Sequence, residues 1–136
     1  MMTDTIYMEE ILEHYKNPLN RGVIDNADIH YHDANPLCGD EIDVFMKIDA
    51  QKNIKDIKTK GKGCAISQAA ASMFTDAIKG KSIEEIRNLK KEFVFGLLQI
   101  QLSPIRIKCA LLAFIAIKKG IYQYLGANEN DDEAIA

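Results

Sequence analysis

Apolar and polar residues recur with two different periods along the chain, and these periods predict its helices and strands. Apolar residues at helical spacing predict a first helix over residues 5–16. Asn17-Pro18 ends this helix, because a residue before proline is pushed away from helical geometry. Alternating positions then predict three strands, the second of them the clearest, over residues 23–31, 41–49 and 54–60.

After Gly61-Lys62-Gly63 the apolar spacing becomes that of helices. Ser82 and Glu85 form a capping-box pattern, and Ser103-Pro104 is typical of a helix start. Four further helices are predicted, over residues 65–79, 83–89, 93–100 and from 103 to about 124. Three short strands joined by turns, including a loop over residues 33–40, form an antiparallel meander. The predicted fold is therefore α+β, with helices packed on one face of a small three-stranded sheet.

Length and composition indicate one folded domain. The chain has 136 residues, of which 47% are hydrophobic and 27% charged, so we expect a single domain over residues 1–127. Residues 128–136 are acidic and predicted to be a disordered tail. The net charge of −3 argues against nucleic acid as a partner. The chain has neither a leader pattern nor an apolar run long enough for a membrane span, so we expect a cytoplasmic protein.

The three cysteines stand out in this ordinary composition. An odd number excludes a simple disulfide framework, and in a reducing compartment unpaired cysteines indicate metal, redox or nucleophilic chemistry, or plain core packing. Cys38, Cys64 and Cys109 all fall at predicted element boundaries, beside glycine or charge. Packing cysteines usually lie inside an element, on its apolar face, so this placement favours chemistry over packing.

The surroundings of the first cysteine indicate a metal ligand set. Gly39 allows the chain to turn between Cys38 and Asp40, which places a thiol and a carboxylate in one loop. Sulfur and oxygen donors together suit Zn²⁺ or iron. The cysteines are 26 and 45 residues apart and include no Cys-x-x-Cys pair, so the spacing itself is not that of a zinc ribbon.

The other two cysteines have neighbours that favour the thiolate form. Gly61 and Gly63 remove side chains around Cys64, which leaves room for a ligand or a partner's backbone. Cys64 also precedes a predicted helix, whose free N–H groups stabilise a thiolate. Lys108 stands beside Cys109, and a nearby ammonium lowers a thiol pKa.

Three motifs resemble the cysteine motifs of the IscU/SufU family, which includes the NifU N-terminal domain. They are Asn35-Pro36-Leu37-Cys38-Gly39-Asp40, Gly61-Lys62-Gly63-Cys64-Ala65-Ile66-Ser67 and Arg106-Ile107-Lys108-Cys109-Ala110. The resemblance extends over most of the chain, from about Tyr7 to Tyr124.

The resemblance implies a scaffold for iron–sulfur cluster assembly. Such a scaffold accepts persulfide sulfur from a cysteine desulfurase, receives iron and electrons from donors, holds a transient [2Fe–2S] cluster and passes it to apo-protein recipients. The family also commonly holds Zn²⁺ in the same pocket. The ligands carried over are Cys38, Asp40, Cys64 and Cys109. Cys109 is the expected persulfide acceptor, with Cys64 also a candidate, and Lys108 is expected to stabilise the thiolate. A homodimer of the cluster-bound form is left open.

Two departures from IscU keep a second interpretation open. IscU scaffolds have histidine before the third cysteine, and this chain has Lys108, which offers a metal no lone pair when protonated. Three sulfurs and one carboxylate resemble SufU, a zinc-dependent sulfur acceptor, yet the chain lacks the insertion typical of SufU. Residues 102–106 also differ from the chaperone-binding stretch of IscU, which leaves delivery by a dedicated Hsp70 open. A plain zinc-stabilised interaction domain is the third alternative.

Other polar residues receive simpler interpretations. His14 is expected to be a partly exposed helix residue. His30 and His32 share one strand face, which predicts a surface pair more readily than a second metal site. A run of lysines over residues 55–62 predicts a solvated strand face, with a desulfurase-docking or anion-steering patch as its functional alternative.

Overall fold

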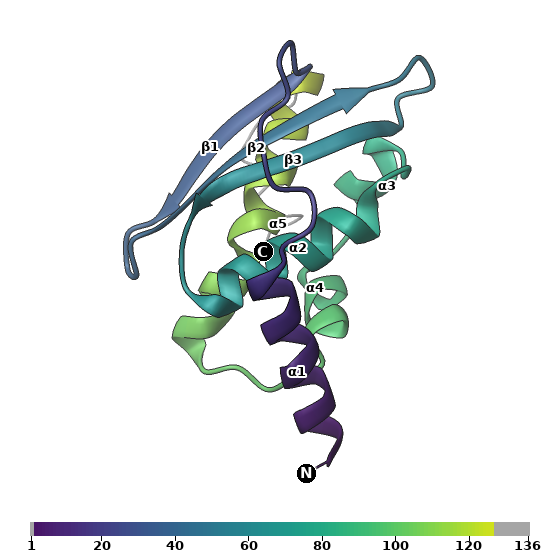
Figure 1. Ribbon diagram of the computed structural model, residues 1–136. Coiled ribbons are helices and arrows are strands. Elements are labelled where there is room, and N and C mark those ends of the chain that lie inside the picture. Colours follow the sequence, from purple (N-terminus) through teal and green to yellow (C-terminus); the bar gives the residue numbers. More distant parts are fainter. Residues whose placement is uncertain (1, 127–136) are drawn as a thin grey trace.

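The structure is a computed structural model, and it describes residues 2–126. Three antiparallel strands form one sheet in the order β1-β2-β3, and α2 and α5 cover one face of it (Figure 1). The predicted α+β architecture is confirmed. The elements are α1 (Met2–Lys16), β1 (Ile29–Asn35), β2 (Asp40–Ile48), β3 (Ile54–Lys62), α2 (Ala65–Ile78), α3 (Ile83–Arg87), α4 (Lys91–Leu98) and α5 (Pro104–Leu125).

The central strand β2 carries the predicted alternation into the core. Ile42, Val44 and Met46 are buried on the helix-covered face. Gly120 lets α5 approach this face closely, because a Cβ there would lie 2.9 Å from Ile29 Cγ2. The long helix therefore lies directly against β1 and β2, and it brings its N-terminal turns to the end of the sheet where β1 turns into β2.

The predicted first strand was wrong in position. Residues 23–28 are not a strand, and β1 extends through residues that were predicted to be a loop, up to Asn35. The segment before β1 follows the edge of β3 instead, where the Thr59 N–H donates to the Asn20 carbonyl (2.8 Å) and Gly22 N–H donates to the Thr59 carbonyl (2.9 Å). Asn26, at a φ of 62°, interrupts any extended run there. The connection between β1 and β2 is thus a tight turn over residues 36–39.

The helix boundaries largely follow their capping chemistry. Ser82 and Glu85 make the predicted capping box at the start of α3, and the Ser103 hydroxyl accepts from the Arg106 N–H at the start of α5. The helix predicted to end at residue 100 ends earlier, because Gln99 adopts the left-handed conformation that closes α4. Gly61 and Lys62, predicted to be part of a turn, continue β3.

One hydroxyl joins α1 to α2. Ser72 is almost fully buried, and its Oγ lies 2.7 Å from His14 Nδ1 and accepts from the Leu19 N–H at 2.8 Å. His14 is half-buried, in agreement with the partly exposed helix residue that the sequence predicted. The contact holds the turn that follows α1 against α2.

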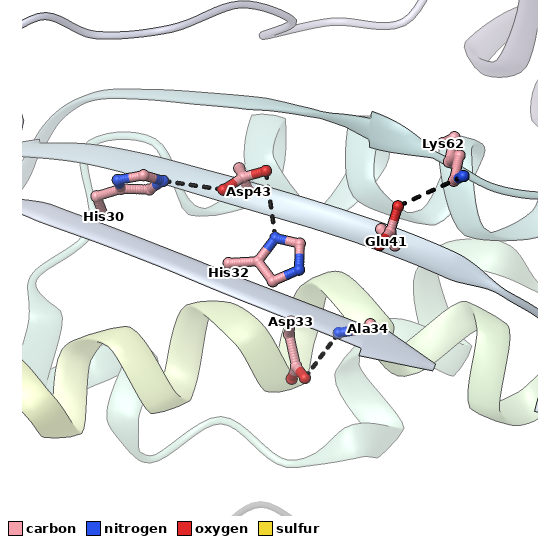
Figure 2. A network of polar contacts seen from close by, with 7 residues as sticks. All are labelled: His30, His32, Asp33, Ala34, Glu41, Asp43 and Lys62. Carbon is pink, nitrogen blue, oxygen red and sulfur yellow. Dashed lines mark hydrogen bonds and ion pairs between the residues drawn. The ribbon is translucent and has the colours of Figure 1, made fainter. Parts of the chain in front are cut away.

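The face of the sheet away from the helices carries a polar cluster (Figure 2). His30 Nε2 lies 2.9 Å from one oxygen of Asp43, and His32 Nδ1 lies 3.3 Å from the other. The His30 ring also stacks on Phe45, with 4.3 Å between centroids. Burial acts to raise the pKa of Asp43, but the two histidines lower it overall. The histidines thus form the predicted surface pair, joined by a carboxylate.

The structure bears differently on the predicted tail, the predicted domain boundary and the expected lack of a membrane-spanning segment. The predicted acidic tail lies outside the described residues, and the single-domain boundary at residue 127 stays a prediction. No helix within residues 2–126 combines the length and apolar character that crossing a bilayer requires.

Candidate metal centre

Two loops and one helix bring the predicted ligands to one end of the sheet, and Cys109, expected at an element boundary, lies buried within α5 instead. Cys38 lies in the β1–β2 turn, Asp40 opens β2, Cys64 precedes α2 and Cys109 lies near the start of α5. Ligand atoms of Cys38, Asp40 and Cys109 all lie within 4.8 Å of one another. The two Sγ atoms of Cys38 and Cys109 are 3.4 Å apart. Cys64 falls outside this group of three but lines the same pocket.

The carboxyl group of Asp40 is buried with half of its hydrogen-bonding capacity unused. The residue is 3% exposed. Its Oδ1 accepts from the Cys64 N–H at 3.2 Å, while its buried Oδ2 has no hydrogen-bond partner among the described residues. Buried carboxylate oxygens are rarely left without a partner, because the desolvation cost is high. An oxygen in this state next to two thiols fits a cation ligand.

The glycines around Cys64 are required by packing within the chain. A Cβ at Gly63 would overlap the Ser67 hydroxyl and lie 3.0 Å from Asp40 Cγ. A Cβ at Gly61 would overlap the Glu41 carbonyl oxygen, because β3 runs so close to β2 there. The space predicted for a ligand or a partner's backbone is thus used, at both positions, by the protein's own atoms.

The environment of Cys64 favours the thiolate form of its side chain. Burial acts to raise its pKa, but hydrogen bonds from the backbone and side chain of Ser67, and one from Cys109, lower it overall. The Ser67 hydroxyl also donates to the Cys64 carbonyl at 3.0 Å. Cys64 occupies the N-cap position of α2, as the sequence predicted, but its own side chain makes no capping hydrogen bond.

Cys109 has the opposite electrostatic environment. It is 1% exposed, and burial, reinforced by its hydrogen bond with Cys38 and by the charges of Cys64 and Asp40, raises the pKa of its thiol well above the usual range. A bound cation would reverse this, because metal coordination deprotonates thiols. Cys38, in contrast, is exposed to solvent.

Arg106 and Lys62, and not Lys108, bring positive charges to the lining of the cysteine pocket. The pocket has a volume of about 730 Å³, and its lining includes Arg106 and the exposed Ile105. Lys108 lines a neighbouring groove on another side of α5. An ammonium acts on a thiolate through space as well as by contact, so the predicted effect of Lys108 on Cys109 stays a prediction.

Sequence reasoning missed two residues of this site. Arg106 precedes Cys109 by three positions on α5, and residues three apart share a helix face. Ser67 follows Cys64 by three positions, the spacing at which a hydroxyl reaches back to the carbonyl at a helix start. Both signals were present in the chain once the helix starts were predicted.

The fold and the site define a small α+β domain that presents three thiols and a carboxylate for a metal ion or for sulfur. The sequence profile of the family described as the NifU-like N terminal domain matches residues 6–131. The chain belongs to this family. It is accordingly a protein of iron–sulfur cluster assembly, either a scaffold or a SufU-type sulfurtransferase.

Named relatives fall on both sides of that alternative. The chain is 40% identical to the zinc-dependent sulfurtransferase SufU of Bacillus subtilis (strain 168), across 92% of this chain and 95% of the relative. It is 35% identical to the iron–sulfur cluster assembly scaffold protein IscU of Haemophilus influenzae, across 87% of this chain and 94% of the relative.

Solved structures share the fold. A putative iron–sulfur cluster assembly scaffold protein for the SUF system from Fervidobacterium islandicum AW-1 is similar with a TM-score of 0.74 at 28% identity, over 86% of this chain and 97% of that one. The N-terminal part of a nitrogen-fixing NifU-like protein from Brucella abortus has the same TM-score at 22% identity, over 94% and 100% of the two chains.

Proposed function

We propose that this protein accepts sulfur from the persulfide of a cysteine desulfurase and assembles a transient [2Fe–2S] cluster on Cys38, Asp40, Cys64 and Cys109. The observation that carries the proposal is the buried carboxylate of Asp40, which lies beside the thiols of Cys38 and Cys109 and whose Oδ2 has no hydrogen-bond partner among the described residues. Such a group is costly to bury unless a cation completes it.

The sulfur step is a thiolate exchange without net oxidation. A cysteine thiolate of this chain attacks the outer sulfur of the donor persulfide, the bond between the two donor sulfurs breaks, and the donor cysteine leaves as a thiolate. The chain then carries the new persulfide. Cys109 is the proposed acceptor in the cation-bound site, because a cation would deprotonate this thiol despite its burial. Cys64, which has the lowered pKa, is the candidate acceptor without a cation.

Cluster assembly also requires a supply of iron and electrons and the release of the finished cluster. Iron and electrons come from donors, and the cluster leaves to apo-protein recipients. Iron and the cluster are cargo, so the site must open to partners, and the exposed Cys38 and Ile105 at the pocket provide that access. Lys108 retains a proposed through-space effect on the thiolates.

A zinc-dependent sulfur acceptor is the second candidate. The observation that favours it is the donor set of three sulfurs and one oxygen without an imidazole, together with 40% identity to a zinc-dependent sulfurtransferase. Zn²⁺ accepts such a set in tetrahedral geometry. Held there, it would keep the thiols deprotonated and ready for exchange.

Metal analysis of anaerobically purified protein, with a visible spectrum, separates the two candidates. Stoichiometric zinc without colour supports the sulfur acceptor. Iron–sulfur absorbance that forms only with iron, cysteine and an active desulfurase supports the scaffold. A protein that binds zinc, forms no cluster, accepts no sulfur and unfolds with a chelator would contradict both, and would leave the zinc-stabilised interaction domain.

A further inference from the structure

We propose that a groove between the outer edge of β1 and α5 binds an extended acidic segment of a partner protein by strand addition. The groove, here called the β1–α5 groove, has a volume of about 290 Å³ and is separate from the cysteine pocket. Its walls are the last three residues of β1, Asp33 to Asn35, with Pro36 of the following turn, and one face of α5 from Lys108 to Lys119.

The strand side of the groove is an open sheet edge. The order β1-β2-β3 leaves β1 with a single neighbouring strand among residues 2–126. The opposite edge is different, because Asn20 and Gly22 hydrogen-bond along β3 there. An open edge presents backbone N–H and C=O groups that a further strand pairs with.

The helix side of the groove is apolar in its middle and positive at both ends. Leu111, Leu112 and Ile115 line it between Lys108 and Lys119. Eleven helical positions separate the lysines, which is about 16 Å along the axis. In an extended segment, two residues four positions apart share a face and lie about 14 Å apart, so the flexible lysine side chains need to close only a few ångströms. The fitting sequence therefore has acidic residues four positions apart, with an apolar residue midway, all three pointing towards α5.

A residue of the protein already makes the contacts that such a segment would make. One oxygen of the Asp33 carboxylate accepts from the Ala34 N–H at 2.9 Å, and the other lies 3.7 Å from Lys119 Nζ (Figure 2 shows the first contact). The Asp33 carboxylate thus occupies the position of a carbonyl of an added strand and also that of an acidic side chain of the added segment. An incoming acidic segment would replace it at both partners.

A buried hydrogen-bond donor, the side-chain amide of Asn35, favours binding of a polar ligand in the same groove. Asn35 is 8% exposed and lines the groove. Its Oδ1 accepts from the Leu37 N–H at 3.1 Å, but its buried Nδ2 has no hydrogen-bond partner among the described residues. A carbonyl or carboxylate in the groove would satisfy this amide, which otherwise carries a desolvation cost.

The test uses a fluorescein-labelled heptapeptide in which threonine alternates with glutamate, isoleucine and glutamate. We expect saturable anisotropy binding to the full chain, with amide shifts in an NMR spectrum confined to β1 and the groove face of α5. Lys119→Ala should weaken binding several-fold, and Asp33→Ala should strengthen it because the internal competitor is gone. Lys91→Ala, on an exposed lysine of α4, is the matched control and should leave affinity unchanged.

Two altered peptides examine the mode of binding. Glutamine in place of both glutamates should weaken binding and remove most of its salt dependence. N-methylation of alternate backbone amides should abolish binding if the segment adds as a strand. Binding that survives N-methylation, or that ignores Lys119→Ala, overturns the proposal.

Two further experimental outcomes would assign the open edge of β1 a different role. If Asp33→Ala makes the chain self-associate and bind no peptide, the Asp33–Lys119 pair guards the edge against aggregation, and the proposal fails. If neutralising Asp131, Asp132 and Glu133 in the full chain shifts the groove amides without peptide, the occupant is the protein's own acidic segment. That result also overturns binding of a partner.

Discussion

Gly63 lies against the carboxyl group of Asp40, so that a Cβ at Gly63 would stand 3.0 Å from Asp40 Cγ. The two residues come from different elements, the β3–α2 junction and the first position of β2. The Cys64 N–H that follows Gly63 donates to the same carboxylate. The orientation of the candidate ligand oxygen therefore depends on the absence of a side chain 23 positions away.

Replacing Gly63 by alanine should lower zinc affinity. The added methyl group overlaps the Ser67 hydroxyl and crowds the Asp40 carboxylate, which accepts from Cys64. Disturbing groups that orient metal ligands costs about 10–100-fold in affinity. Competition with a chromogenic chelator measures the change. Gly96→Ala is the control, because a Cβ there meets nothing within 4 Å. Equal affinities of the two variants would contradict the positioning role of Gly63.

Replacing Asp40 by alanine should act in opposite directions on the two metals. Zinc affinity should fall because one of four ligands is lost. Loss of a reconstituted cluster in thiol-containing buffer should slow, because the hard carboxylate is the weakest ligand for soft iron–sulfur iron and is displaced first. Decay of visible absorbance after reconstitution measures the second effect. A decay rate equal to or faster than that of the wild type would exclude Asp40 as the labile ligand.

Serine substitutions of the three cysteines should identify the sulfur acceptor. With zinc bound, Cys109→Ser should abolish the gain of one sulfur atom in intact mass after incubation with a desulfurase and cysteine. Cys38→Ser should still gain sulfur if zinc remains, because the proposed acceptor is intact. Without zinc, the gain should depend on Cys64, whose thiol has the lowered pKa. Normal sulfur gain by zinc-bound Cys109→Ser would remove Cys109 from the role.

Lys118 should make stability depend on pH. It is fully buried on α5, its ammonium donates to the Leu89 carbonyl at 2.5 Å, and burial, with a smaller effect of Lys90, lowers its pKa from 10.5 to about 8. Between pH 8 and 10.5 the unfolded chain holds this proton more strongly than the folded chain, so the free energy of unfolding should rise with pH. One proton limits the slope to about 1.4 kcal/mol per pH unit.

The matched variant is Lys118→Met, measured by urea unfolding across that range. Thiols titrate there in both proteins, so the difference between the two curves isolates the lysine. The difference should grow in favour of the wild type as pH rises. A constant difference would mean that Lys118 stays charged, or uncharged, in both states.

Elements with strong local signals were predicted closely. β2 has the clearest alternation in the chain, and α3 has the capping box of Ser82 and Glu85, and both lie where predicted. β1 was misplaced because its position follows from pairing with β2, in a register from Ile29↔Met46 to Asn35↔Asp40. Its own residues are polar and mixed, so they favour no strand boundary by themselves.

For the candidate site, the sequence named the residues but did not show whether they meet in space. Cys38, Asp40, Cys64 and Cys109 were named from motifs, since glycine, helix starts and neighbouring charges are local features of the chain. The sequence also determined the fold class and the absence of a ligand histidine beside Cys109. Whether these four residues share one site depends on how the β1–β2 turn, the β3–α2 junction and the start of α5 pack together.

Tertiary structure alone decided which groups meet. It placed the thiols of Cys38 and Cys109 3.4 Å apart and left Asp40 Oδ2 buried without a partner in the described chain. It also put Lys62 and Arg106, rather than Lys108, in the pocket. The physical reason is that local propensity sets backbone conformation over a few residues. Distance, burial and side-chain direction between remote positions arise only from strand register and helix packing.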